Sequence, residues 1–111
     1  MAANGHAVAL DDAHPLTDGH TLIVPRRHSI DLFELTAAEL AAVWELTVAV
    51  RDKLTRGGVV DFNLGANIGA AAGQTVDHAH LHLIPRRPGD VPDPACGIRC
   101  VIPDRQVWTK L

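Results

Sequence analysis

The sequence contains few aromatic residues, few cysteines and no strong excess of one charge. It has two Trp, two Phe and no Tyr among 111 residues, so a core must be built mainly from aliphatic side chains. The formal net charge of −3 argues against the basic surface that nucleic-acid-binding proteins usually carry. No apolar run approaches the roughly 18 residues of a membrane span. We therefore expect one globular domain over residues 1–111, with neither a nucleic acid nor a membrane as its partner.

The cysteines and the N-terminus indicate in which cellular compartment the protein is expected. Cys96 and Cys100 match neither a redox CxxC motif nor a four-ligand zinc pattern. The first residues lack a charged start followed by an apolar segment, so no signal peptide is predicted. These features favour the cytoplasm, where we expect both thiols to be reduced.

Local signals predict one long helix. Thr36 and Glu39 have the spacing of a capping box, and Gly57-Gly58 would end the helix after about Arg56. Apolar residues recur at helical spacing at Leu40, Val43, Leu46, Val50 and Leu54. Trp44 and Val48 widen this apolar stripe, and the surplus is compatible with either a subunit contact or a monomer core.

Short apolar runs bounded by Gly and Pro predict four strands, at about 6–10, 20–27, 59–69 and 76–85. Two strands precede the helix and two follow it. This order predicts an α+β fold around an antiparallel sheet. The proline-rich tail is expected to be irregular, with one short strand near Val101.

The run "VDHAHLHLI" at residues 76–84 is the strongest signal of chemistry. In a strand, His78, His80 and His82 point to one face, and the apolar residues between them point to the other. A merely solvated polar face is one interpretation, although Ser, Thr or Lys would serve it equally well. A metal site is a second, but the outer histidines lie about 13 Å apart along a strand, so His20 or Asp12 would have to complete it.

A histidine nucleophile is the third interpretation. Neutral imidazole is available near pH 7, and one ring nitrogen can attack while the other donates a hydrogen bond that fixes the tautomer. The preceding "GANIGAAAGQT" consists largely of small residues that let a backbone approach a ligand closely. Backbone N–H groups of such a loop can bind phosphate oxygens.

Together, His78-Ala79-His80-Leu81-His82-Leu83-Ile84, the preceding "AGQTVDH" and the upstream "LTDGHTLIVPRRH" resemble the histidine triad (HIT) family of nucleotide hydrolases and transferases. The resemblance covers about residues 7–102. It is closer to the branch that acts on dinucleoside polyphosphates and nucleoside phosphoramidates than to the uridylyl transferases. It implies a HIT-like fold with a five-stranded antiparallel sheet, one long helix, one short helix and an irregular C-terminal extension over 88–111. It also implies a homodimer.

The resemblance implies a role for each histidine. His80 would attack the α-phosphorus and form a nucleotidyl-histidine intermediate, which water would hydrolyse to a nucleoside monophosphate. His82 would hold an α-phosphate oxygen or assist the leaving group. His78 would support the site, with its backbone carbonyl available to His80. His20 would reach the same phosphate.

The resemblance also implies how a purine-type nucleotide would be bound. Asp12 matches the residue that binds the ribose hydroxyls, and Asn67 a polar position beside the leaving group. Gln74 and Thr75 match the phosphate loop. No metal ion is expected to be required, although Mg²⁺ would arrive with a polyphosphate substrate.

The sequence departs from the family pattern at both ends. The chain starts almost on its first expected strand, so the N-terminal segment that helps to form the nucleobase pocket in relatives is expected either to be short here or to begin upstream of this start. The cysteines of their optional zinc site are missing. In the tail, Trp108 is a candidate aromatic contact. Two alternatives to a nucleotide hydrolase stay open: a nucleotide-binding interaction protein with vestigial turnover, and a His-ligated zinc hydrolase.

Overall fold

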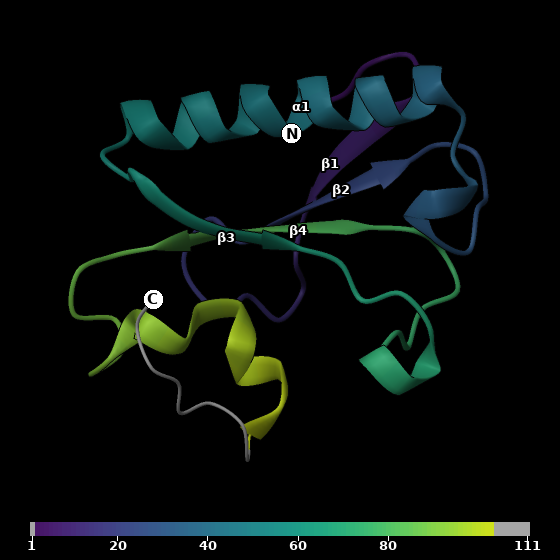
Figure 1. Cartoon of the computed structure of the whole chain (residues 1–111). Helices are drawn as coiled ribbons and strands as arrows, with labels where there is room; N and C mark the ends of the chain where they lie inside the picture. Colours follow the sequence, from purple (N-terminus) through teal and green to yellow (C-terminus); the bar gives the residue numbers. More distant parts are fainter. Residues whose placement is uncertain (1, 104–111) are drawn as a thin grey trace.

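The computed structural model describes residues 2–103, which form an antiparallel sheet with an α-helix across one face (Figure 1). The strands are β1 (Ala7–Asp11), β2 (Thr21–Pro25), β3 (Asp61–Gly65) and β4 (Leu81–Arg86), and the helix is α1 (Ala37–Arg56). Three short 3-10 segments are η1 (Leu32–Glu34), η2 (Ala70–Ala72) and η3 (Pro94–Val101). The strand order is β1-β2-β4-β3, with antiparallel neighbours throughout. The predicted α+β class is confirmed.

The sheet has four strands in the part of the chain that the structure describes, so the expectation of five is wrong. The residues before β1 contribute only an isolated bridge between Ala3 and Val8. Asn4 explains the shortness of this pairing, because its side-chain oxygen accepts hydrogen bonds from the N–H groups of His6 and Ala7. These bonds turn the chain back toward β1 before a second strand can extend.

The helix α1 begins and ends as predicted. The Thr36 side chain accepts from the Glu39 N–H and the Glu39 side chain accepts from the Thr36 N–H, which forms the capping box. The predicted apolar stripe is only partly correct, because Leu40 is exposed although Val43 and Leu46 are buried. Trp44, one turn after Leu40, is also exposed. The sheet therefore covers a narrower stripe of the helix than the sequence pattern suggested.

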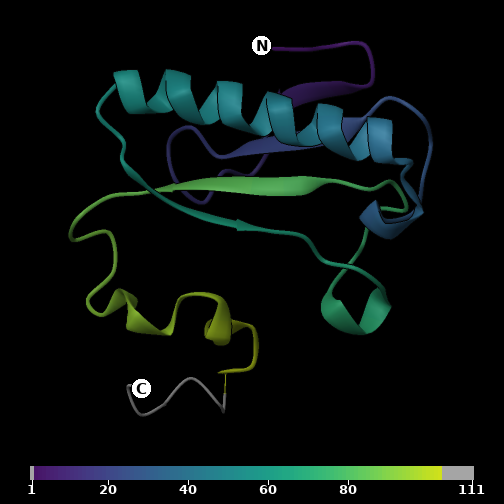
Figure 2. The same cartoon turned by 45° about the horizontal axis from the view of Figure 1, so that its top comes forward.

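The core lies between α1 and one face of the sheet. It consists of Ala7, Ala9, Ile23, Val43, Leu46, Val50 and Leu83. Along β2, Thr21, Ile23 and Pro25 are buried while Leu22 and Val24 between them are partly exposed, as strand alternation requires. The opposite, outer face of the sheet is therefore free of the helix. Figure 2 shows η3 on the side of this outer face, away from α1.

The tail differs from its prediction in two respects. Residues 94–101 form the 3-10 segment η3, so a strand near Val101 is wrong. Cys96 and Cys100 form a disulfide within η3, which contradicts the expected pair of reduced thiols. Trp108 lies outside the described residues. Within the described range, no helix is long and apolar enough to cross a membrane.

Candidate active site

The histidine motif lies where β4 begins. The strand starts at Leu81, so only His82 belongs to it, and the expectation of one strand through His78 and His80 is wrong. The reason lies in the neighbouring strand, because β2 ends at Pro25, which has no N–H to continue the ladder. The chain is held there instead by the Ala79 N–H, which donates to the Ser29 carbonyl at 2.7 Å.

The sheet register places His82 in a line of four residues across the outer face. Leu10 of β1 pairs with Leu22 of β2, Leu22 pairs with His82, and His82 pairs with Gly65 of β3. Two leucines therefore lie on one side of the imidazole and a glycine on the other. A ligand can therefore contact both sides of His82, with leucine side chains on one side and the Gly65 backbone on the other.

The backbone fixes the tautomer of His80. Its Nδ1 lies 2.8 Å from the backbone carbonyl oxygen of His78. A carbonyl oxygen only accepts, so Nδ1 carries the proton and Nε2 has a free lone pair in the neutral ring. This is the state that a histidine nucleophile requires. The ring centroids of His80 and His82 lie 5.1 Å apart, close enough for both to contact one phosphate group.

A second backbone carbonyl anchors His78. Its Nε2 lies 2.8 Å from the carbonyl oxygen of Pro25, so Nε2 donates this hydrogen bond. The bond ties the chain before β4 to the end of β2. His78 thus holds the carbonyl that orients His80.

His20 lies beneath the outer face and contacts His82. Its side chain is only 3% exposed. The Leu16 N–H donates to its Nδ1 at 3.1 Å, so the proton of the neutral ring is on Nε2. That Nε2 donates to Nδ1 of His82 at 2.9 Å, which leaves the proton of His82 on its own Nε2. The pair therefore presents one N–H donor at His82.

Asp12 completes this cluster. Its Oδ2 lies 3.5 Å from Nε2 of His20 and 3.9 Å from Nδ1 of His82. The hydrogen bond from the His14 N–H lowers the pKa of Asp12, and the neighbouring imidazoles contribute in the same direction, so the residue is a carboxylate at neutral pH. A carboxylate here can accept hydrogen bonds from ligand hydroxyls.

Burial is the main influence on the protonation of His82. It lowers the pKa of His82 below its usual value, and the neighbouring rings of His80 and His20 lower it further. The Asp12 carboxylate opposes this shift, but it is the smallest contribution. His82 is therefore neutral at pH 7 and acts there as a hydrogen-bond donor rather than as a fixed positive charge.

The loop before the histidines carries the remaining predicted residues. The Gln74 side chain donates to the carbonyls of Ile30 and Val76 and accepts from the Gly69 N–H. Because the Gln74 amide is engaged within the loop, a phosphate bound at this position would contact backbone N–H groups rather than this side chain. Thr75 is exposed in the same loop. Asn67 does lie near the cluster, where it lines a hollow together with His82.

Two hollows open beside the histidines. The smaller, about 220 Å³, lies beside His78 and His80 and is walled by Leu10, Leu22, Val24 and Val76. The larger, about 430 Å³, lies beside His20 and His82. It extends from Asn67 to the tail residues Ile98 and Val101.

Several of these residues were not identified from the sequence. Leu22 and Val24 had a usable signal, since they are apolar at the alternate positions of a strand whose other face forms the core. The Leu16 N–H and the Pro25 carbonyl act through the backbone and leave no trace in side-chain patterns. Ile98 and Val101 come from a tail whose path depends on tertiary contacts.

Asp12, His20 and His82 also form a group whose donor atoms are close enough to hold a metal ion, all lying within 4.8 Å of one another. The tautomer of His20 opposes this use. A metal on Nε2 requires the proton on Nδ1, where the Leu16 N–H already donates. The residues therefore fit a metal poorly unless that hydrogen bond breaks.

Comparison with known proteins is consistent with this geometry. The family model described as HIT domain matches residues 1–89. An uncharacterized HIT-like protein of Mycoplasma genitalium is 42% identical over 88 residues, 78% of this chain and 62% of the relative. The adenylylsulfatase HINT3 of Arabidopsis thaliana is 39% identical over 80 residues, 71% of this chain and 41% of that protein.

Solved structures agree. The NitFhit protein of C. elegans superimposes with a TM-score of 0.76 at 36% identity, over 82% of this chain and 22% of the other. A zinc-bound histidine triad family protein from Mycobacterium smegmatis gives 0.73 at 30% identity, over 90% and 78% of the two chains. The chain spans about three fifths of the length of the first curated relatives, 62% and 60%.

Proposed function

Because this chain belongs to the HIT domain family, we propose that it is a nucleotide hydrolase or nucleotidyl transferase that forms a covalent intermediate on His80. The hydrogen bond from Nδ1 of His80 to the His78 carbonyl carries this proposal, since it leaves the Nε2 lone pair free to attack phosphorus. The substrate is a purine nucleotide whose α-phosphate bears a leaving group.

The smaller hollow is suited to the nucleobase. Leu10, Leu22 and Val24 provide an aliphatic wall next to His80, and an apolar wall stabilises an aromatic base through burial. The Asp12 carboxylate, beyond Leu10 on β1, would accept hydrogen bonds from the ribose hydroxyls. These contacts would place the α-phosphate between His80 and His82.

The first chemical step forms a bond from Nε2 of His80 to phosphorus while the bond from phosphorus to the leaving group breaks. The Nε2–H of His82 would donate to a phosphate oxygen, and His20 holds His82 in the tautomer that has this proton. Water then attacks the nucleotidyl-histidine and releases a nucleoside monophosphate. His80 returns to its neutral form and one proton goes to solvent.

A trapping experiment tests this mechanism. Protein incubated with an adenosine phosphoramidate labelled in the adenosine should gain one adenylyl group, measured by intact mass after rapid alkaline denaturation. His80→Ala should gain none and should show no turnover. His6→Ala is the matched control, because His6 is exposed and lies outside the site. A labelled His80→Ala protein would contradict the proposal.

A nucleotide-binding protein with vestigial turnover is distinguished by the same assay, since it would bind the nucleotide without turnover. The donor atoms of Asp12, His20 and His82 lie close enough to hold a metal ion, which keeps a zinc hydrolase as a second candidate. In the proposed mechanism no metal ion is required, and Mg²⁺ enters only with a polyphosphate substrate. Loss of activity on metal removal would favour the zinc hydrolase.

We also propose that the protein is a homodimer. Leu40 is 51% exposed and Trp44 56% exposed, and they are neighbours on the side of α1 that the sheet leaves uncovered. Light scattering should give twice the 11.9 kDa of one chain. Trp44→Glu should reduce this mass to that of a monomer, whereas Glu45→Gln on the same helix should not.

A further inference from the structure

One peptide group orients the proposed nucleophile and is itself held at its other end. The peptide between His78 and Ala79 presents its carbonyl oxygen to Nδ1 of His80 at 2.8 Å. The N–H of the same peptide donates to the Ser29 carbonyl at 2.7 Å. Because a peptide group is planar, a contact that fixes its N–H also fixes the direction of its carbonyl oxygen. The orientation of His80 therefore depends on the position of Ser29.

Ser29 belongs to residues 25–30, which run from the end of β2 into the loop before η1. This segment holds the chain that leads into β4 at two further places. The Pro25 carbonyl accepts from Nε2 of His78 at 2.8 Å, and the His28 ring packs edge-on against the His78 ring with centroids 5.3 Å apart. The position of the histidine motif therefore depends on where residues 25–30 lie.

An arginine within residues 25–30 ties the segment to the helix. Nε of Arg27 donates to one carboxylate oxygen of Glu39 at 2.8 Å and its Nη2 donates to the other at 2.9 Å, which makes a two-bond fork. The same Nη2 donates to the Glu34 carbonyl at 3.0 Å. Glu39 is buried in the first turn of α1, so its position is fixed by the helix. Figure 1 shows residues 25–30, in blue, at the end of the sheet where α1 begins.

We propose that Arg27 is a positioning residue for the reaction at His80. Without the fork to Glu39, residues 25–30 would lose their tie to α1, and the Ser29 carbonyl would no longer hold its peptide partner in one place. A displacement of a reacting group by about 1 Å can lower a rate about a hundredfold. Arg27 is not among the described residues that line either hollow, so it acts through the backbone rather than on the substrate. This inference rests on the proposed function.

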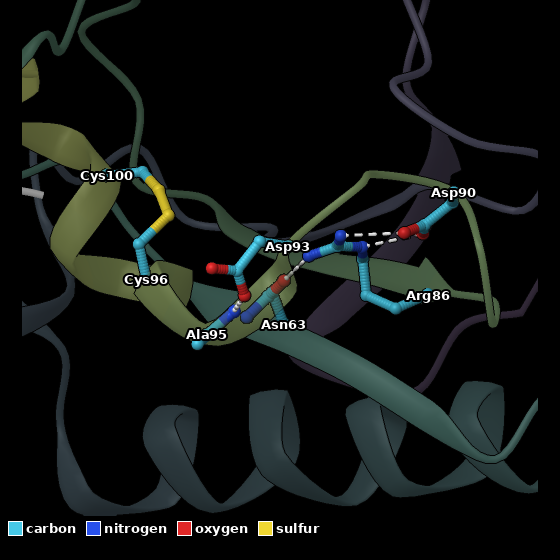
Figure 3. Close-up of a disulfide and its surroundings, with 7 residues drawn as sticks. All are labelled: Asn63, Arg86, Asp90, Asp93, Ala95, Cys96 and Cys100. Carbon is cyan, nitrogen blue, oxygen red and sulfur yellow. Dashed lines mark hydrogen bonds and ion pairs between the residues drawn. A yellow bond between two sulfur atoms is a disulfide. The ribbon is translucent and has the colours of Figure 1, made fainter. Parts of the chain in front are cut away.

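A fork of this kind can also act on stability alone, and the chain contains a matched control for that case. Arg86 donates to both Asp90 carboxylate oxygens at 2.8 Å and to the Asn63 side chain (Figure 3). These partners lie outside residues 25–30 and outside the chain that leads into β4. Arg86→Gln therefore breaks a fork of the same geometry without touching the contacts that orient His80.

Steady-state hydrolysis of adenosine phosphoramidate is the first measurement. Arg27→Gln should lower kcat about tenfold or more with a smaller change in KM, because the apolar wall for the base stays in place. Arg27→Lys keeps the charge but not the fork, so its kcat should lie between those of wild type and Arg27→Gln. Arg86→Gln should keep kcat within about twofold of wild type. Arg27 is half exposed, and Arg27→Lys carries the test where Arg27→Gln does not fold.

Amide hydrogen exchange, followed by NMR without substrate, is the second measurement. The Ala79 amide donates to Ser29, whereas Leu83 is buried in β4 between β2 and β3. In Arg27→Gln the acceleration of exchange at Ala79 should exceed that at Leu83 about tenfold, because the opening is local. In Arg86→Gln the two amides should change by the same factor. A merely structural role of Arg27 would also accelerate both amides equally.

The two measurements separate this inference from the proposed function. Selective exchange at Ala79 together with a lowered kcat in Arg27→Gln supports the positioning role. If wild type hydrolyses the phosphoramidate but Arg27→Gln keeps its kcat, or if Ala79 and Leu83 exchange faster by equal factors, the inference is overturned and the proposed function stands. If wild-type protein shows neither turnover nor an adenylyl group on His80, the proposed function falls and the role of Arg27 in the reaction falls with it.

Discussion

The Nδ1 atom of His80 lies 2.8 Å from the backbone carbonyl oxygen of His78. This contact links the orientation of one imidazole to the position of a peptide group two residues earlier. The peptide group is held in turn by the bond from the His78 ring to Pro25. Reactivity at His80 therefore depends on a side chain that need not touch the substrate.

His78→Ala should weaken this support without removing the nucleophile. The variant keeps the carbonyl of residue 78 but loses the bond to Pro25, which is worth about 1 kcal/mol, so kcat should fall about fivefold to tenfold. The adenylyl group should still be trapped on His80. Steady-state kinetics measures the fall in kcat, and intact mass detects the adenylyl group. Complete loss of labelling in His78→Ala would contradict the assignment of His80 as the nucleophile.

The protonation of His82 gives a pH-dependent prediction. Its pKa is lowered by burial, so in an NMR titration its ring should titrate below the ordinary value of about 6.5. Asp12→Asn removes the one contribution that raises this pKa and should move the titration lower still. Because the folded state favours the neutral ring, this residue adds stability above about pH 6.5 that is lost as the pH falls toward its folded pKa. Titration of His82 above 6.5 would contradict the assignment.

Acid stability should depend on Glu39. The hydrogen bonds from Arg27 and from the Thr36 N–H lower the pKa of Glu39 from 4.5 to about 2. Its stabilisation is therefore complete above about pH 4.5 and is lost as the pH falls toward 2. Glu39→Gln keeps an acceptor for the Thr36 N–H but removes the charge, so it should lower the Tm at pH 7 by a few degrees and converge with wild type near pH 2.

The control for this prediction is Asp52→Asn on the same helix. Asp52 forms an ion pair with Arg51, and both side chains are about half exposed. Exposed ion pairs contribute little to stability. Thermal melts from pH 2 to pH 7 should show little change in this variant. Equal destabilisation in both variants would mean that the net charge of α1, rather than the Arg27 contact, determines its acid stability.

Metal removal should leave the reaction intact. The Leu16 N–H occupies Nδ1 of His20 and keeps the proton on Nε2, the atom that would face a metal ion. Treatment with EDTA, verified by elemental analysis, should therefore not change the turnover of an adenosine phosphoramidate. Recovery of lost activity by added Zn²⁺ would instead assign the Asp12 cluster to a catalytic metal.

The elements that depend on local signals could be predicted from the sequence. The capping box of Thr36 and Glu39 and the glycines after Arg56 are short-range features, and α1 begins and ends where they indicate. The alternation of small or apolar residues with histidines around Ala79 and Leu83 correctly indicated which side faces the core. The HIT resemblance rested on this segment together with the two that precede it.

The remaining features depend on partners far away in the sequence. The start of β4 at Leu81 is set by Pro25, 56 positions earlier, through a missing N–H donor. The tautomers of His20 and His80 depend on backbone groups whose position only the folded chain defines. Leu40 lies at the edge of the stripe that contains Val43 and Leu46, and the sheet covers too narrow a stripe to bury it. The 3-10 conformation of η3 was not indicated by its sequence, where the prolines predicted an irregular chain.

The position of β3 at the border of the sheet has a consequence for assembly. Its inner neighbour is β4, and no strand among the described residues 2–103 pairs with its other side, where the backbone can accept a further strand. A strand added there would lie about 4.8 Å from Gly65 and about 10 Å from the backbone of His82. A second subunit that contacted the free edge of β3 would thus be separated from the phosphate at His82 by β3 alone.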